Sequence, residues 1–464
     1  MSFVLGIPPV ILNLVQEGML ERSFHDGLYP ALLYRSEAQE EEWDANTGTE
    51  IFMSRPGLLA PVTEPLASDQ DPTPQTLTYE QWSASLARYA NTIDTHIPTS
   101  VVSNADQFAR NIHQLGLNAG QSLNRIPRNA LFKAYLSGHT VLTVATAAPD
   151  TQIAVASING FTDRISPSVF ARPQPVSPST PLQIVLDPAG TPITRNVIAA
   201  VPDNPDDPFG PGTLTLDVAV GAVLAARIPV LSSARPAIIR EGGGFSVDAI
   251  GAGDTLTLQS IIAAVNYLRK RNVPPHEDGY YHAHYDTDGN TQIFEDPAFQ
   301  RLNTGLPDHT YYQEAFVGKI GAATGYLNSE APDSTNSGNT TSTGATGALY
   351  SAGIGAETIN NASIPIGRTI VTGRGAIVEK WLDEKSFVTE AGTTGKIGDF
   401  QIVNGGVEVK TERIRLILRS PVNRLQDKVA ATWSISTSFP IPSDITAGGP
   451  ERFKRAVVIE HAGA

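Results

Sequence analysis

Cysteine is absent from the 464-residue chain, so neither a disulfide nor a thiolate metal site can form. That absence fits folding in a reducing cytoplasm. No apolar run approaches ~18 residues, so the sequence predicts no membrane-spanning helix, and its start lacks the basic region and cleavage site of a secretion signal. Positive charge is also scarce. The protein has a net charge of −14, which argues that binding the phosphates of nucleic acid is not its main role.

The composition favours several domains built from short strands and turns. With 464 residues, roughly two to four domains are expected. Hydrophobic residues make up 41% of the chain, which is enough for sizeable cores, and 40 glycines and 34 prolines indicate many turns. The sequence therefore predicts an α+β protein rather than a helical bundle.

A long polar excursion separates two alternating segments near the N-terminus. Residues 49–53 and residues 79–97 both alternate between apolar and polar side chains, as strands do. The excursion between them is rich in proline, with Pro56, Pro61, Pro65, Pro72 and Pro74. We expect residues 36–102 to form an extended two-stranded loop that lies against another surface, because a lone hairpin is only marginally stable. A long disordered linker is the alternative.

Helical patterns flank this loop. Residues 1–35 are expected to form an N-terminal arm with one short helix. Residues 103–138 carry the longest helical signal, with apolar side chains at three- and four-residue steps from Phe108 to Leu136. Pro127 is expected to kink or restart this helix, and Gly138 to end it.

The composition changes twice after residue 138. Residues 139–250 are rich in proline, threonine, valine and isoleucine with few charges, which predicts an inserted all-β domain. Asp254 is then expected to cap a helix that reaches Leu268. Residues 251–400 are mixed, and residues 401–464 are mainly strands. A single strand is expected over residues 407–418, with Arg413 and Arg415 on one face.

Residues 278–327 concentrate histidines, tyrosines and acids. Residues 281–285 alternate like a strand, which places His282, His284 and Asp286 on one side. Zinc accepts such ligands, but the spacing is only weakly specific, and a strand with one polar face explains it equally. Residues 286–290 fail the calcium-loop pattern, because positions six and twelve hold Thr291 and Pro297; a turn is expected instead. We therefore predict no catalytic residues, no metal and no cofactor.

Two clusters of opposite charge are candidates for contacts between subunits. Complementary patches favour register and specificity at an interface. A solvated sheet face is the competing interpretation of the basic cluster. The acidic candidates are Glu37, Glu40, Glu41, Glu42 and Asp44, and the basic candidates are Arg413, Arg415, Arg419, Arg424 and Lys428.

The order of these parts resembles that of the major capsid proteins of tailed phages, with the Hong Kong 97-type shell fold and an insertion domain. The segments that carry the resemblance are spread over most of the chain, and residues 139–250 are the least diagnostic part. They are residues 60–66, 92–100 (TIDTHIPTS), 110–125 (RNIHQLGLNAGQSLNR), 272–284 (NVPPHEDGYYHAH) and 411–429 (TERIRLILRSPVNRLQDKV).

The resemblance implies an architecture of arm, extended loop, spine helix, axial domain and peripheral domain. These parts are expected at residues 1–35, 36–102, 103–138, 251–400 and 401–464, with the inserted β domain at 139–250. It also implies a shell of pentamers and hexamers that encloses double-stranded DNA in the virion after assembly in the host cytoplasm. Portal protein would be a partner, and the family often uses scaffolding or decoration proteins as well.

Three further expectations follow. Some members of the family crosslink subunits through a lysine in the extended loop, but this chain has no lysine before Lys133, so no such crosslink is expected. An encapsulin-like nanocompartment shell is an alternative function on the same fold. A metal-dependent enzyme built on His282, His284 and Asp286 is the other.

Overall fold

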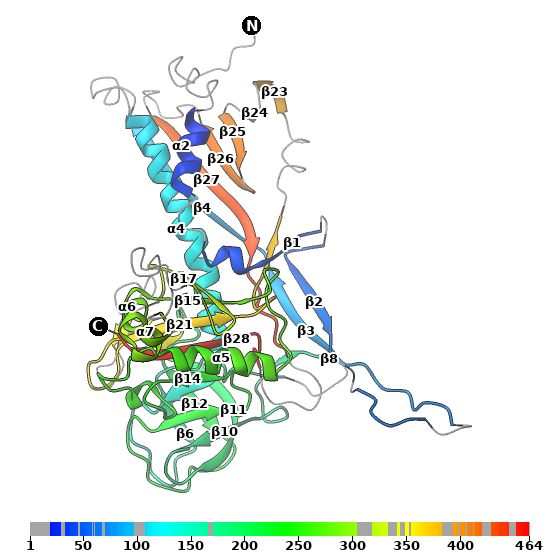
Figure 1. Ribbon diagram of the computed structural model, residues 1–464, viewed down its shortest axis with the longest axis vertical. Helices are drawn as coiled ribbons and strands as arrows, with labels where there is room; N and C mark the ends of the chain where they lie inside the picture. The colour runs from blue at the N-terminus through cyan, green and yellow to red at the C-terminus, as the bar shows by residue number, and fades with distance from the viewer. Residues whose placement is uncertain are drawn as a thin grey trace. The chain divides into compact units, whose positions relative to one another are not determined.

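The computed structural model describes most of the chain, and it is a mixed α+β protein (Figure 1). By its internal contacts the chain divides into two compact units. Unit 1 comprises Met1–Ile51, Ser83–Pro127 and Val378–Pro440, and unit 2 comprises Phe52–Trp82, Arg128–Ile377 and Ile441–Ala464. The described residues are 19–28, 33–44, 47–57, 59, 61–66, 70–96, 107–165, 170–303, 318–332, 341–343, 349–351, 354–382, 393–397, 400–403, 406–411, 413–419, 428–444 and 452–463.

An eight-stranded sheet forms the body of unit 1. Seven strands follow the order β1-β22-β27-β26-β25-β24-β23, and β4 pairs with the other side of β27. The ten-residue pairing of β4 with β27 is antiparallel and runs from Ala87↔Thr437 to His96↔Lys428. The strands are β1 Gln39–Glu42, β4 Ala87–His96, β22 Val378–Trp381, β23 Thr393–Ile397, β24 Phe400–Val403, β25 Gly406–Thr411, β26 Ile414–Arg419 and β27 Lys428–Ser438.

Two expectations about these strands were wrong. Residues 79–97 form two strands rather than one: β3 pairs with β2, while β4 joins the large sheet. Residues 407–418 are also split, because Arg413 takes a left-handed conformation (φ 70°) between β25 and β26 and the chain reverses there. Arg413 and Arg415 therefore do not share a strand face.

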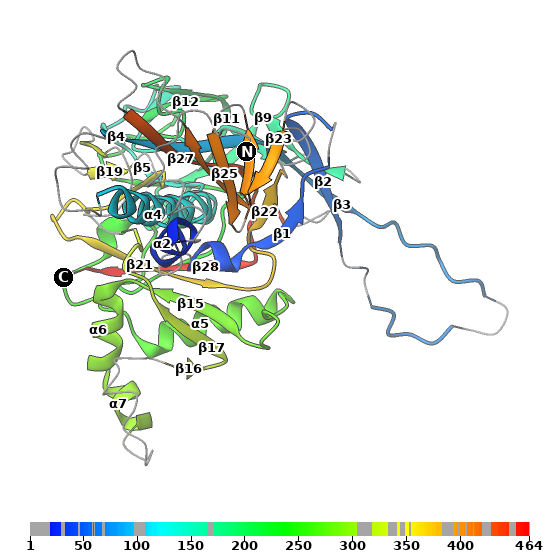
Figure 2. The ribbon, with the colours of Figure 1, turned by 90° about the horizontal axis from the view of Figure 1, so that it is seen from above.

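Helix α2 (Met19–Leu28) lies beside α4 (Gln107–Tyr135) (Figure 2). The two helices meet at a pair of glycines. A Cβ atom on Gly116 would lie 2.4 Å from the carbonyl oxygen of Phe24, and one on Gly27 would lie 2.7 Å from that of His113. The backbones can approach this closely only because neither glycine has a side chain. The two helices share one core with the inner faces of β26 and β27.

Pro127 lies inside α4 without ending it, so the expected restart of the helix was wrong. Proline removes one backbone hydrogen bond from a helix interior. Leu123 and Leu131 on the flanking turns are both fully buried, and burial of this kind offsets the lost bond. The observed helix otherwise matches the predicted one, of which residues 103–106 lie outside the described part.

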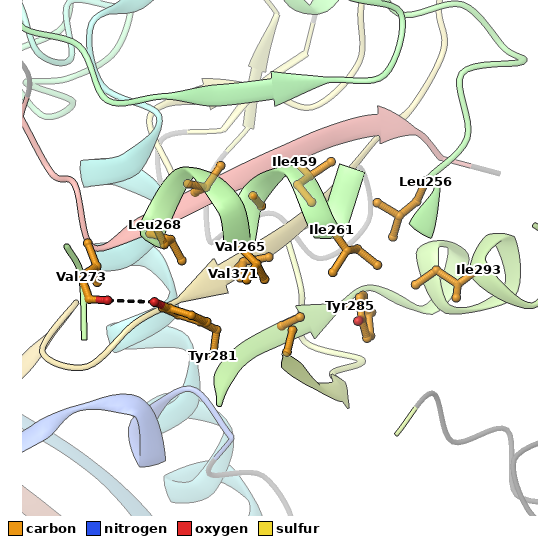
Figure 3. Packing of buried hydrophobic residues seen from close by; sticks show 14 of the residues in the cluster. Leu256, Ile261, Val265, Leu268, Val273, Tyr281, Tyr285, Ile293, Val371 and Ile459 are labelled. Carbon is orange, nitrogen blue, oxygen red and sulfur yellow. Dashed lines mark hydrogen bonds between the residues drawn. The ribbon is translucent and has the colours of Figure 1, made fainter. Parts of the chain in front are cut away.

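A six-stranded mixed sheet with one covering helix forms the first layer of unit 2. Its order is β14-β28-β21-β15-β17-β16, and α5 packs on it through Ile261, Val265 and Leu268 (Figure 3). The predicted strand at residues 281–285 is confirmed as β15. The bounds are β14 Ile238–Arg240, α5 Leu258–Lys270, β15 Tyr281–Tyr285, β16 Lys319–Ile320, β17 Ala323–Leu327, β21 Ile366–Thr372 and β28 Ala456–Ala462.

The start of α5 differs from the expectation. Thr257 caps the helix, and its hydroxyl accepts from the Ser260 amide. Asp254 instead accepts from the Gly251 amide at 2.7 Å and holds the preceding turn. Both residues are good cap formers, so the sequence did not distinguish them.

Unit 2 also contains a closed β-barrel. Its strands follow the order β5-β13-β10-β11-β12-β6, and the ends meet because Leu142 pairs with Val155. Bonds from the Thr143 amide to the Ala154 carbonyl and from the Ala156 amide to the Val141 carbonyl, both 3.0 Å, complete the closure. The strands are β5 His139–Val141, β6 Gln152–Val155, β10 Leu182–Leu186, β11 Ile193–Pro202, β12 Gly212–Leu216 and β13 Pro229–Ser232.

The barrel has its own core, with Phe161, Ile184 and Leu214 all fully buried. Closure leaves no free sheet edge in it. That residues 139–250 are an insertion stays a prediction. The remaining elements are η2 Arg35–Glu37, β2 Glu50–Pro56, β3 Tyr79–Ser85, β7 Asp163–Ile165, β8 Phe170–Ala171, β9 Pro173–Pro175, η3 Val247–Ala249, α6 Thr287–Glu295, α7 Pro297–Asn303, β18 Thr341–Thr343, β19 Leu349–Ser351 and β20 Ala356–Glu357.

Candidate assembly surfaces

The extended loop begins where β2 and β3 separate, and it presents apolar side chains to solvent. Strands β2 and β3 lie in one small sheet, and the Gly57 amide still bonds to the Thr78 carbonyl at 2.7 Å. Beyond this bond the chain runs out in a long excursion (Figure 1). Every described residue between 59 and 76 is exposed. Leu59, Val62 and Leu66 are 56%, 80% and 60% exposed.

Four charged side chains form a cluster at the base of this loop. Arg55 of β2 lies 3.6 Å from the Glu80 carboxylate of β3 and 3.5 Å from that of Asp444. Arg455 donates to Asp444 at 2.7 Å. The Arg55 guanidinium also lies 5.4 Å from the centre of the Trp82 ring. Both strands of the loop are thereby tied to the segment around residue 444.

The two carboxylates of the cluster are buried and the two arginines are half-buried, and burial changes the acidity of the carboxyl groups. Loss of solvent raises the pKa of Glu80 to about 7, and the neighbouring Asp444 carboxylate acts in the same direction, against Arg55 and Arg455. Burial likewise raises the pKa of Asp444, again opposed by the two arginines. Glu80 is therefore a group that takes up a proton near neutral pH.

The acidic candidates lie on and around β1, at the edge of the large sheet. Strand β1 pairs in parallel with β22, from Gln39↔Val378 to Glu42↔Trp381. Just before it, Arg35 forms a bidentate pair with Glu379, with bonds of 2.8 to 3.1 Å, and both side chains are almost fully buried. This buried pair fixes where the acidic strand begins.

Two of the acidic candidates form ion pairs with basic side chains of the same chain. Glu40 contacts Arg413, and the Arg413 guanidinium also lies 4.4 Å from the Trp381 ring. Glu41 lies 3.1 Å from the ammonium of Lys380, a residue that the sequence did not single out. The structure thus brings an acidic and a basic candidate together within one subunit.

The other candidates are dispersed. Glu37 is buried, whereas Glu42 and Asp44 are exposed. Arg415 is buried in β26, and Lys428 is exposed at the start of β27. The side chain of Arg419 and the whole of Arg424 lie outside the described residues. A contact of these clusters with a neighbouring subunit stays a prediction.

The polar side chains on β15 contact different partners. His282 stacks on His276, with ring centres 3.9 Å apart, and lies 3.3 Å from Asp278. His284 stacks on the Tyr326 ring. Within the part of the chain that the structure describes, no grouping holds ligand atoms of His282, His284 and Asp286 together as a metal site.

Asp286 starts a helix rather than a turn, which corrects the expectation for residues 286–290. Its carboxylate accepts from the Gly289 amide at 2.9 Å and caps α6. The same carboxylate lies 3.2 Å from Nε2 of the buried His461. Burial lowers the pKa of His461, but Asp286 outweighs it, so the net shift is upward. Asp286 therefore connects the C-terminal strand β28 to α6.

Sequence reasoning missed the cluster at the base of the loop. The only local signal was that Arg55 and Glu80, of opposite charge, flank the proline-rich excursion. Their partners Asp444 and Arg455 come more than 350 residues later, so no pattern along the chain could join them.

The part of the chain that the structure describes contains no helix long and apolar enough to cross a membrane.

Comparisons with known proteins give structural similarities only. No protein-family model matches the sequence, and no curated protein matches it. The chain is similar to the capsid of the cyanophage P-SCSP1u (TM-score 0.45, 9% identity, covering 92% of this chain and 87% of that one). It is also similar to the capsid of Ralstonia phage GP4 (TM-score 0.44, 12% identity, covering 92% of this chain and 87% of that one). A third similar structure is the acid-stable capsid of Helicobacter pylori bacteriophage KHP30 (TM-score 0.47, 7% identity, covering 92% of this chain and 88% of that one).

Proposed function

We propose that this chain is a capsid shell protein of a tailed bacteriophage, which assembles through its extended loop into an icosahedral head. The observation that carries the proposal is the loop itself. Its described tip residues are all exposed, yet they include Leu59, Val62 and Leu66. Three large apolar side chains held in solvent along one protruding segment are what a covering neighbour would explain.

The base of the loop supports the same function. A flexible excursion would make a poor contact, because ordering it on binding costs conformational entropy. Here Arg55 and Glu80 bind both strands of the loop to the segment around Asp444. The loop therefore leaves the subunit in a direction that is set before any neighbour is met.

The order of parts supports the finer proposal. A short N-terminal helix, an extended loop, a long helix, a mixed sheet with one helix and a C-terminal strand follow one another as in the family that the sequence resembles. On this basis the subunits form pentamers and hexamers, and the shell encloses double-stranded DNA without reading its sequence. Portal protein is then a partner, as scaffolding or decoration proteins often are in the family that the sequence resembles, and assembly takes place in the bacterial cytoplasm.

Electron microscopy of the purified full-length chain tests the proposal. We expect closed shells or, at lower concentration, rings of five and six subunits. Particles purified from the natural source should contain double-stranded DNA. Particles filled with a protein cargo would point to a nanocompartment instead, and a monomer at every concentration would refute a shell function of either kind.

A further inference from the structure

A small cavity in unit 2 lies where the β-barrel meets the six-stranded sheet. Its volume is about 40 Å³. His139 and Ala156 line it from the barrel, and Arg240, Arg368 and Glu460 line it from strands β14, β21 and β28. None of these residues belongs to the loop or to the acidic strand, so the cavity is independent of the proposed assembly surfaces.

The charged groups around the cavity balance one another. Glu460 accepts from Arg240 at 2.8 Å and from Arg368 at 3.1 Å. Glu357, which also lines the cavity, pairs with Arg227, and Arg227 binds Asp248 through its other edge. Three guanidinium groups thus face three carboxylates. No net positive charge is left over that would call for an anion in the cavity.

Two residues that line the cavity each carry a buried nitrogen without a partner among the described residues. Arg368 is fully buried; its Nε bonds to Glu460 and its Nη2 to the Glu357 carbonyl, but its Nη1 bonds to nothing described. The Nδ1 atom of His139 is likewise buried and has no hydrogen-bond partner among the described residues. A buried donor or acceptor that stays unpaired is costly, so such atoms usually bind ordered water or a ligand.

The two nitrogens differ in what they require. Arg368 Nη1 can only donate. His139 Nε2 lies 3.1 Å from the carbonyl oxygen of Pro236, so Nε2 must carry a proton and donate. Burial, together with the nearby Arg240, lowers the pKa of His139 to about 3, so the ring is neutral and its Nδ1 can only accept. A single occupant would have to accept on one side and donate on the other.

We propose that this cavity is a binding site for ordered water, in which one molecule accepts a hydrogen bond from Arg368 and donates one to His139. Water offers both functions, and one molecule needs ~10–15 Å³ of such space, so the cavity holds a few at most. A halide can accept but cannot donate, and it would add a charge where the charges already cancel. The water joins the first strand of the barrel to the central strand of the neighbouring sheet.

A structure of the full chain at a resolution that shows buried water tests the proposal. We expect a density peak within hydrogen-bond distance of both Arg368 Nη1 and His139 Nδ1. Crystals soaked in sodium bromide provide the second arm, because bromide is visible by its anomalous signal. A bromide peak beside Arg368, or no density there while other buried waters are visible, would overturn the proposal.

Two substitutions at His139 separate the water contact from simple loss of the ring. His139→Phe keeps an aromatic ring but removes both the Nδ1 acceptor and the Nε2–H that donates to Pro236, so it should abolish the bridging peak and lower the melting temperature by about 2 °C. His139→Gln supplies both an acceptor and a donor, and it should restore most of the stability and the peak. A bridging peak that survives in His139→Phe would contradict the assignment.

Discussion

The β-barrel and the excursion between β2 and β3 both belong to unit 2, but their apolar side chains lie in opposite environments. The barrel closes on itself through Leu142 and Val155 and buries Phe161, Ile184 and Leu214 in a core of its own. The loop closes on nothing, and its described tip residues are all in solvent. Apolar side chains stabilise the barrel from within, whereas those of the loop can contribute only when a neighbour covers them. Stability and assembly should therefore be separable by mutation.

The largest effect is expected in the barrel core. Phe161→Ala removes a fully buried ring, and such truncations cost about 3–5 kcal/mol because they leave a cavity. Urea unfolding would measure the loss, with Val201→Ala on the exposed side of β11 as the control, since Val201 is 58% exposed. A loss below about 1 kcal/mol for Phe161→Ala would mean that the barrel is not held by its own core.

The base of the loop should be sensitive to pH. The pKa of Glu80 is about 7 in the folded protein and about 4.5 in an unfolded chain, so between these values only the folded state holds the proton. Its contribution to the free energy of unfolding therefore rises as the pH falls from 7 to 4.5, by at most about 3 kcal/mol. The groups that face Glu80 are Arg55, Asp444 and Arg455.

Glu80→Gln imitates the protonated form and should remove most of this pH dependence. Denaturant unfolding between pH 5 and pH 8 would show it, with Glu64→Gln on the exposed loop as the matched control. If wild type and Glu80→Gln respond identically to pH, then Glu80 is not the titrating group.

The acidic strand should show the smallest effect on stability. Reversing Glu40, Glu41 and Glu42 to lysine breaks two partly exposed pairs, to Arg413 and Lys380, and pairs near the surface contribute about 0–1 kcal/mol each. If these acids also dock on the basic cluster of a neighbour, assembly should fail much more clearly than folding, and the failure should depend on salt. Light scattering at two ionic strengths would follow it; normal shells from the variant would exclude that contact.

The absence of a lysine before Lys133 gives one more expectation. The subunits should separate fully on boiling in detergent, because the loop has no amine to form a covalent bond. A ladder of subunit multiples on the gel would show a crosslink that the sequence does not predict.

Local patterns predicted the elements well, and distant pairings poorly. The strand at residues 281–285 and the helix around residues 107–135 followed from the period of their apolar side chains. The split at Arg413 did not, since a left-handed arginine leaves no signal in a run of alternating residues. Nor did the Arg35–Glu379 pair, whose partners are 344 positions apart. Such contacts depend on how sheets are ordered, and one sequence does not specify that order.

Sedimentation velocity of two triple-serine variants tests most directly whether the loop is the contact between subunits. Leu59, Val62 and Leu66 change in one variant, and Val144, Val218 and Val223 on the barrel, which are 55%, 58% and 78% exposed, change in the other. Both should unfold like wild type. We predict that the loop variant sediments as small species while the barrel variant forms shells. Shells from the loop variant would contradict the proposed role of the extended loop.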